Sequence, residues 1–248
     1  MLLAAPVVLA QGYPERPIRY VVPYPAGGAS DTISRVIAQQ ISKSMGQPVV
    51  IDNRPGANGN MGTEEVVRAP ADGYTLLSTS TSVMTINPTL YRNLNFDASR
   101  DLTAVAYVAP VAIVLVVHPS VPAKNLAQLL AYLKATPGKV NFSSSGSGTT
   151  GHLAGELLKQ RVGADILHVP YKGDAPAFAD LLGGHVQMMF ATTVTAAQHI
   201  SAGRLVPIAL AGLERDPMLA NLPTMAESGL PGFDAMQSSR LARRRGCR

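Results

Sequence analysis

Residues 141–156, NFSSSGSGTTGHLAGE, contain the glycine spacing G-x-G-x-x-G at Gly146, Gly148 and Gly151. The motif follows a strand-like run and opens a helix-like run, which is the setting of a dinucleotide-binding turn. Glycines at this spacing let the backbone approach a pyrophosphate closely, and a helix start holds its charge. The first hypothesis is therefore a nucleotide site, which would indicate an oxidoreductase.

A dinucleotide site also needs an acidic residue, about 20 residues further on, that binds the ribose hydroxyls from the carboxyl end of the next strand. Asp165 lies at that distance, but it precedes the expected strand 166–171 instead of following it. The chain has no G-x-x-x-x-G-K-[ST] motif that would indicate a P-loop. The glycine spacing alone therefore does not predict a nucleotide site.

Hydrolytic and metal chemistry find no support in the residue pattern. The chain has no G-x-S-x-G motif and no H-E-x-x-H motif, and its five histidines show no spacing that indicates a catalytic triad. We expect structural roles for His152, His168 and His185, no metal site and no cofactor. An α/β enzyme acting on a small carboxylate or nucleotide remains an alternative, as does a ligand-sensing module for a signalling partner.

Anion binding is the chemistry that the loop residues themselves favour. The first backbone N–H groups of a helix are unpaired and carry partial positive charge, so they bind carboxylates or phosphates without Lys or Arg. The hydroxyls of Ser144, Ser145, Thr149 and Thr150 add donors to such a site. A second loop, YPAGGASD at 24–31, has close-approach glycines and a Ser or Asp that could cap the helix after it.

Strands and helices alternate along the chain, which predicts parallel sheets joined by right-handed βαβ units. Pro110 interrupts the long β-rich run 102–119, so we expect two α/β lobes that change over near this residue. The expected strands are 17–24, 48–53, 74–80, 139–144, 166–171, 186–191 and 205–211, and the expected helices are 30–46, 60–69, 125–135, 151–162, 176–183 and 195–202. In open α/β sheets, ligands bind beyond the carboxyl ends of the strands, so the two glycine loops could hold one ligand between the lobes.

Charge and cysteine content exclude some classes of function. The net charge of +5 comes from the segment RLARRRGCR at 240–248, because removing its five Arg leaves 16 basic against 16 acidic residues. A nucleic-acid binder should carry its basic surface on the folded body, so we expect no nucleic-acid partner. Cys247 is the single cysteine, which excludes an intrachain disulfide and fits an oxidising compartment.

The N-terminus reads MLLAAPVVLAQ, with Val8-Leu9-Ala10 before Gln11, and resembles a secretory cleavage site without its basic start. We expect residues 1–12 to be the remnant of a clipped signal peptide. No apolar run reaches the ~18–20 residues that span a membrane.

Taken together, several stretches resemble the receptors of tripartite tricarboxylate transporters, the Bug-type extracytoplasmic solute-binding proteins. The matching stretches run in family order from about residue 13 to 234: YPERPIRYVVPYPAGGASDTISRVIAQQIS, GQPVVIDNRPGANGNMGTEEV, ADGYTLLSTSTSVMTINPTLY, FSSSGSGTTGHLAGELLKQ, HVPYKGDAPAFADLLGGHVQMMF and LPTMAESGLPGF. The resemblance implies a two-lobed, class II-like Venus-flytrap fold, periplasmic capture of a di- or tricarboxylate or an aromatic acid, a membrane permease as partner, and a monomer.

The resemblance also assigns a site. It implies a first loop from Ala26 to Asp31, a second from Ser144 to Thr150, and a third strand end within the run from Ser78 to Ser82. The ligand-binding residues expected are Ala26, Gly27, Gly28, Ser30, Asp31, Thr79, Ser80, Ser144, Ser145, Gly146, Thr149, Thr150, Ala191 and Thr192. Many relatives carry Asp-Asn where this chain has Ala191-Thr192, so an amino-acid ligand is less expected.

The expected division is lobe 1 at 13–109, lobe 2 at 110–228, and a return crossover with an aberrant Arg-rich tail at 229–248. The resemblance stops near Asp234, whereas family members continue with a crossing strand and helices that complete the first lobe. We therefore expect a frameshift or truncation that leaves lobe 1 incomplete. Lost apolar burial, at roughly 25 cal/mol per Å², would then lower stability and impair closure.

Overall fold

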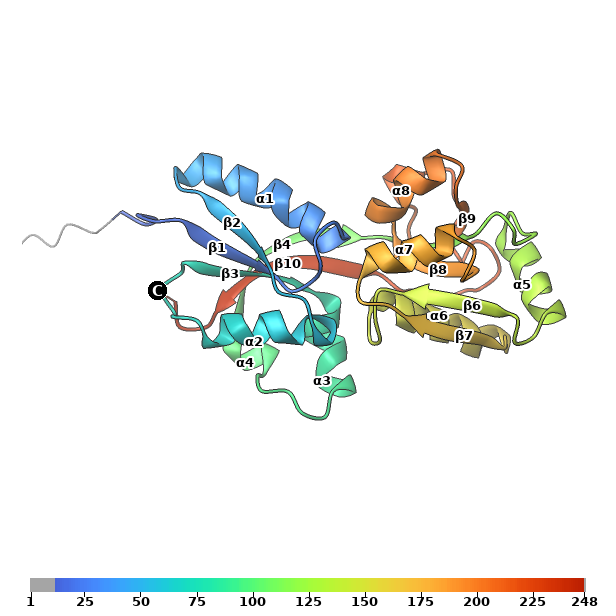
Figure 1. Cartoon of the computed structure of the whole chain (residues 1–248), viewed down its shortest axis with the longest axis horizontal. Helices are drawn as coiled ribbons and strands as arrows, with labels where there is room; N and C mark the ends of the chain where they lie inside the picture. Colours follow the sequence, from blue (N-terminus) through green and yellow to red (C-terminus); the bar gives the residue numbers. More distant parts are fainter. Residues whose placement is uncertain (1–11, 248) are drawn as a thin grey trace, which may run out of the picture.

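The computed structural model describes residues 12–247, which form two α/β lobes side by side along the long axis of the molecule (Figure 1). The expected signal-peptide remnant lies outside these residues except for Gly12. Each lobe has one five-stranded sheet. Among the described residues, no helix combines the length and apolarity that crossing a membrane requires.

Lobe 1 is built on a sheet with the order β2-β1-β3-β10-β4. The strands are β1 Ile18–Val22, β2 Val49–Asn53, β3 Thr75–Ser80, β4 Leu102–Val111 and β10 Gln237–Arg244. Helix α1 (Ala29–Met45) covers one face of the sheet and α2 (Asn60–Arg68) the other (Figure 1). The short helices α3 (Asn87–Leu90) and α4 (Ala98–Asp101) lie on the α2 side.

Helix α1 follows the expected pattern with one exception. Ile37, Ile41 and Met45 pack against the sheet, whereas Val36 is 58% exposed because it falls outside the stripe that faces β1 and β2. Gly46 ends the helix as predicted: its φ of 68° is left-handed, and its N–H donates to Ser42 O at 3.1 Å.

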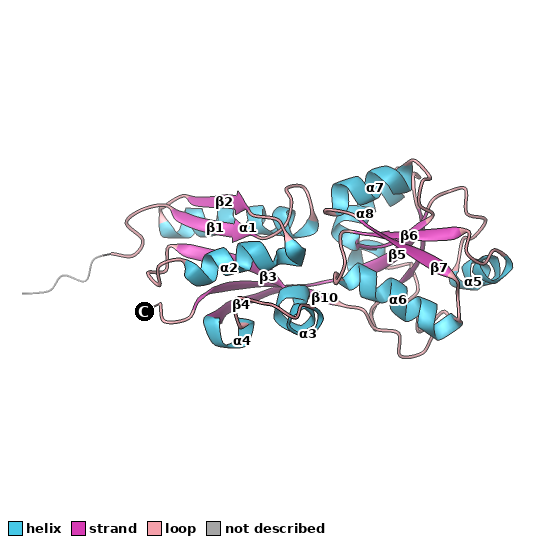
Figure 2. Ribbon diagram, turned by 60° about the horizontal axis from the view of Figure 1, so that its bottom comes forward, coloured by secondary structure: helices cyan, strands magenta, loops and turns pink. Residues whose placement is uncertain are grey.

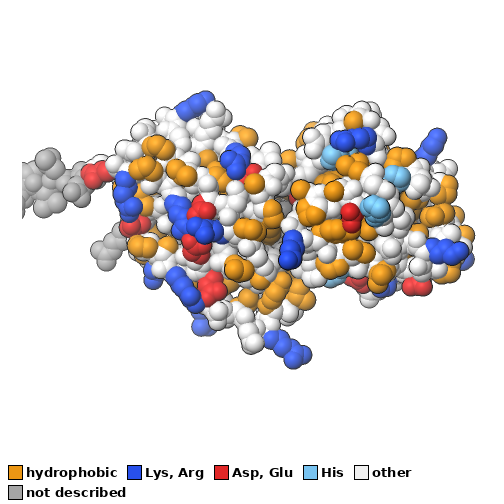
Figure 3. Space-filling view, in the orientation of Figure 1, with side chains coloured by type: hydrophobic (Ala, Val, Ile, Leu, Met, Phe, Trp, Pro, Cys, Tyr) orange, Lys and Arg blue, Asp and Glu red, His pale blue; other side chains and the backbone are white. Residues whose placement is uncertain are grey.

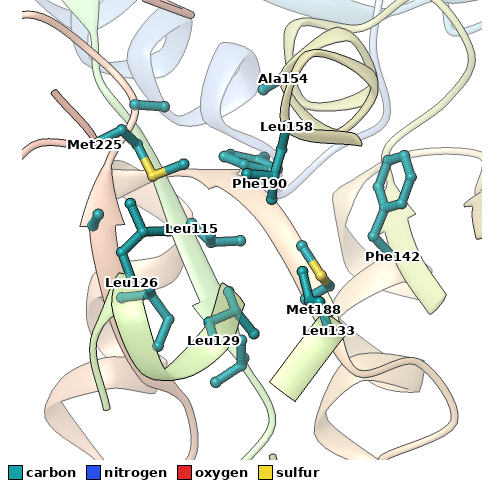
Figure 4. Packing of buried hydrophobic residues seen from close by; sticks show 14 of the residues in the cluster. Leu115, Leu126, Leu129, Leu133, Phe142, Ala154, Leu158, Met188, Phe190 and Met225 are labelled. Carbon is teal, nitrogen blue, oxygen red and sulfur yellow. The ribbon is translucent and has the colours of Figure 1, made fainter. Parts of the chain in front are cut away.

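Lobe 2 has the strand order β7-β6-β8-β5-β9. Its strands are β5 Ile113–Val117, β6 Val140–Ser144, β7 Ile166–Pro170, β8 Met188–Thr192 and β9 Val206–Leu210. Helices α5 (Leu126–Ala135) and α6 (Thr150–Val162) cover one face, and α7 (Asp174–Leu182) and α8 (Thr193–Ser201) cover the other (Figure 2). In the larger core, Phe190 of β8 lies beneath Ala154 and Leu158 of α6 (Figure 4).

The expectation of parallel sheets is wrong in part, because both sheets are mixed. β1 pairs in parallel with β2 and β3, but β10 runs antiparallel to β3 and β4. In lobe 2, β5 runs antiparallel to β8 and β9. The antiparallel strands border the passages between the lobes: the chain leaves lobe 1 after Val111 and enters lobe 2 at Ile113, close to Pro110, and β10 follows the return passage (Figure 1).

Residues 237–244 form an inner strand, where the sequence pattern had indicated an aberrant tail. Ser239, Leu241 and Ala242 are buried between β3 and β4, and bulges after Ser239 and Leu241 shift the β4 register. These bulges blur the alternation that would predict a strand. On the face seen in Figure 3, Lys and Arg side chains are scattered over both lobes.

Candidate functional site

A small pocket of about 50 Å³ lies where the two lobes meet. We call it the inter-lobe pocket; its lining residues are Tyr24, Pro25, Ala26, Gly28, Ala29, Ser30, Ser80, Ser82, Ser145, Thr149, Gly173, Asp174, Thr192 and Gln237. Of the predicted residues, it therefore contains Ala26, Gly28, Ser30, Ser80, Ser145, Thr149 and Thr192. Both glycine loops reach the same pocket, from opposite lobes.

The lobe 1 wall is the N-terminus of α1. Its N-cap, Gly28, is extended (φ −80°, ψ 173°) and has no side chain of its own to cap the first amides of the helix. The first intrahelical bond is Thr32 N–H to Gly28 O at 3.0 Å. The amides before Thr32 thus lack an i−4 partner and give this wall its partial positive charge.

Asp31 lies behind this wall and does not line the pocket. Its carboxylate accepts hydrogen bonds from Gly27 N–H (3.0 Å), Arg35 Nε (2.9 Å) and Asn53 Nδ2 (3.0 Å). Burial raises the pKa of Asp31, but these donors outweigh it and hold the pKa below its usual value. Asp31 therefore fixes the loop and does not face the ligand space. Gly27 lines a different pocket, on the other side of the loop.

The lobe 2 wall is the loop before α6. Thr149 caps the helix by accepting a hydrogen bond from His152 N–H at 3.3 Å, and its own hydroxyl donates to Gly146 O at 2.8 Å. Ser145 faces the pocket, while Gly146 lines the adjoining opening. The amides of Thr150 and Gly151, like those of α1, have no i−4 partner within the helix.

Strand alternation removes three predicted residues from the pocket. Ser80 faces it and lies 2.7 Å from the Tyr24 hydroxyl, so its neighbour Thr79 points to the other face of β3. Ser144 and Ala191 are likewise buried away from the pocket. Thr150 is also buried, and its hydroxyl has no hydrogen-bond partner.

Four polar residues of the pocket are absent from the sequence-based set: Tyr24, Ser82, Asp174 and Gln237. Gln237 begins β10, which the sequence pattern did not indicate. Asp174 is the first residue of α7 and follows Gly173, whose backbone is left-handed with φ 114°. A strand end followed by Gly-Asp is a helix-start signal that could have indicated Asp174. Lys and Arg are absent from the described residues that line the pocket.

A histidine pair supports the second loop from behind. His168 Nε2 lies 2.6 Å from Ser144 Oγ, and its ring stacks on His152 with centroids 4.0 Å apart. His152 Nδ1 accepts a hydrogen bond from Gly148 N–H at 3.1 Å. Burial, followed by the charges of His152 and Lys159, lowers the pKa of His168 to about 4. Both histidines therefore help to hold the second loop in place.

The histidine pair predicts an acid-sensitive fold. His168 has a pKa of about 4 when folded and near 6.5 when unfolded, so the unfolded chain takes up the proton first as the pH falls. The free energy of unfolding should be fully retained above pH 6.5 and drop by about 1–2 kcal/mol towards pH 4, after allowing for partial exposure. Urea unfolding of His168→Gln at both pH values should show a smaller drop than the wild type. An equal drop would assign the effect to other groups.

Residues 33–242 match the family model described as tripartite tricarboxylate transporter family receptor. The chain belongs to this receptor family. The match continues past Asp234, where the sequence resemblance was expected to stop, and enters β10. BugT of Bordetella pertussis is 41% identical over 234 residues, which cover 94% of this receptor and 72% of BugT.

Solved structures agree in fold over almost the whole receptor. Rpa4515 of R. palustris, solved with adipate, has a TM-score of 0.93 at 36% identity and covers 95% of this chain and 79% of its own. MatC of Rhodopseudomonas palustris, solved with bound malate, has a TM-score of 0.88 at 30% identity, covering 95% and 80%. The receptor thus has the two-lobed periplasmic-binding-protein fold, in a family of solute-binding receptors and not of enzymes.

Proposed function

We propose that this receptor captures a small carboxylate in the inter-lobe pocket and closes around it. The observation that carries the proposal is that two helix N-termini meet in one pocket. Helix α1 of lobe 1 has no cap from its own N-cap residue, and helix α6 of lobe 2 is capped by Thr149. Backbone amides at helix starts bind a carboxylate, and the hydroxyls of Ser30, Ser145 and Thr149 add donors.

The body of the ligand would lie in an adjoining pocket of about 410 Å³. This space shares Tyr24, Pro25, Ser145 and Gly173 with the inter-lobe pocket, and Pro55, Tyr91 and Tyr171 add apolar surface. Lys172 lines it and could pair with a second carboxylate. An elongated dicarboxylate or an aromatic acid fits this arrangement, and relatives have been solved with adipate and with malate.

Capture requires that the ligand bind the closed state better than the open one. A ligand carboxylate can contact α1 and α6 at the same time only when the lobes are closed. Its binding therefore shifts the population towards the closed state. Membership of this family supports a periplasmic location after export through a signal peptide, and a membrane permease that accepts the closed receptor. Both belong to the proposal.

A thermal-shift screen tests this function. Adipate, malate, citrate and benzoate should be compared with uncharged analogues such as adipamide, at one ionic strength. A ligand at 100 times its dissociation constant should stabilise the fold by about 2.7 kcal/mol, and the shift should need the carboxylate. Equal shifts with acid and amide, or none with any acid on a protein that unfolds cooperatively, would contradict carboxylate capture.

A further inference from the structure

Asp174 belongs to lobe 2, yet its carboxylate lies against lobe 1. A Cβ built on Gly28 would lie 3.1 Å from Asp174 Oδ2, so the carboxylate sits directly at the N-cap of α1. Burial raises the pKa of the Asp174 carboxyl group, and the Ser145 hydroxyl of lobe 2 and the Ala29 amide of lobe 1, which face it, oppose that rise. This one side chain therefore joins the two lobes through the wall proposed for the ligand.

The start of α1 favours the carboxyl group of Asp174 for the same reason that it favours a ligand carboxylate. Helix α1 has no cap of its own, and the start of a helix favours a negative charge. Asp174 places its carboxyl group at this helix start from the other lobe. Since the amides of one helix start offer few donors at short range, Asp174 and a ligand carboxylate compete for them.

Lys and Arg are absent from the described residues that line the inter-lobe pocket, so no cation there pairs with both carboxyl groups. Asp31, on α1, is already paired with Arg35. Burial raises the pKa of Tyr24 to about 12, so its hydroxyl is uncharged at neutral pH. His199, which borders Asp174 on the far side, has a lowered pKa and is also neutral there. The few free amides at the start of α1 hold one carboxyl group at a time, so a ligand carboxylate must displace Asp174.

We propose that Asp174 is an internal competitor for the ligand: it binds the start of α1 in the empty receptor, holds the lobes together, and leaves when a ligand carboxylate takes its place. Only the displacement of Asp174 by a ligand rests on the proposed function; the contact that holds the empty lobes together does not. The contact stabilises the ligand-free state and not the bound state, so it lowers the apparent affinity. The strength of the contact thus sets a threshold for which carboxylates are retained.

The test compares Asp174→Ala and Asp174→Asn with Asp165→Asn, which removes an exposed charge from the same lobe. Small-angle scattering on the ligand-free proteins should show a larger radius of gyration for both Asp174 variants and no change for the control. Calorimetry with adipate as the probe should show affinity raised by about threefold or more in the Asp174 variants.

Either of two results overturns the proposal. One is a radius of gyration that stays at the wild-type value in both Asp174 variants. The other is adipate affinity that fails to rise in them, which would make Asp174 a ligand contact or a bystander. If the wild type binds no adipate, the proposed function is in question, but the scattering result still decides whether Asp174 holds the empty lobes together.

Discussion

Replacing Ala29 by proline is expected to weaken carboxylate binding by roughly 10- to 100-fold with the fold intact. Ala29 is the first residue of α1, where proline is tolerated because the missing N–H has no intrahelical partner. Gly28 is already extended, which is the conformation that a following proline requires. The substitution therefore removes one amide donor from the inter-lobe pocket, and a hydrogen bond to a charged group contributes about 1.5–3 kcal/mol.

The matched control is Ala98→Pro. Ala98 is also a buried alanine at the first position of a helix, α4, but it lies in lobe 1 away from the pocket. Both variants should unfold within a few degrees of the wild type, and calorimetry should show weakened binding in Ala29→Pro alone. Unchanged affinity in Ala29→Pro would mean that the amides of α1 do not hold the ligand.

Gly173→Ala is expected to keep the lobes apart and to lower affinity by roughly tenfold. Gly173 lies at the end of lobe 2 that touches lobe 1, and a Cβ there would lie 2.8 Å from Pro25 Cγ. The proline ring is fixed to its own backbone and cannot rotate away, so relief requires the lobes to separate. Its left-handed backbone adds a strain of about 1–3 kcal/mol for alanine.

Gly229→Ala is the control that separates backbone strain from an effect on lobe closure. Gly229 has a similar φ of 110°, against 114° for Gly173, but a Cβ there meets nothing within 4 Å. Both variants should lose comparable stability in chemical denaturation. Gly173→Ala alone should have a larger radius of gyration in the presence of saturating adipate. If the two variants bind adipate equally well, the Gly173–Pro25 contact does not limit closure.

The alternation of apolar runs and helix signals was sufficient for most of the fold. Expected helices such as 125–135 and 195–202 correspond to α5 and α8 within a few residues, because an amphipathic period and a cap residue mark their ends locally. The sheet directions were not predictable in this way. Whether β5 runs parallel or antiparallel depends on its long-range partners, β8 and β9, which no local pattern specifies.

The candidate site was predicted at the level of loops and only in part at the level of side chains. Ser80 and Thr192 reach the pocket, but their neighbours Thr79 and Ala191 do not, because a strand sends successive side chains to opposite faces. Asp31 looked available in the sequence and is occupied by three donors in the structure. Asp174 contacts α1 only through the packing of one lobe on the other, which a linear pattern cannot show.

The place of β10 in the sheet of lobe 1 also sets an order of assembly. The strands of lobe 2 come from one continuous stretch, from Ile113 to Leu210, and residues that follow it, among them Leu222, Met225 and Phe233, pack on its cores. Among the described strands, β4 lies at the sheet edge and pairs with β10 alone, so its pairing must wait for residues 237–244. Non-local pairings of this kind form late and expose edges meanwhile. As the chain is synthesised from its N-terminus, lobe 2 is therefore expected to fold first. Lobe 1, although it begins earlier in the sequence, is expected to be completed last.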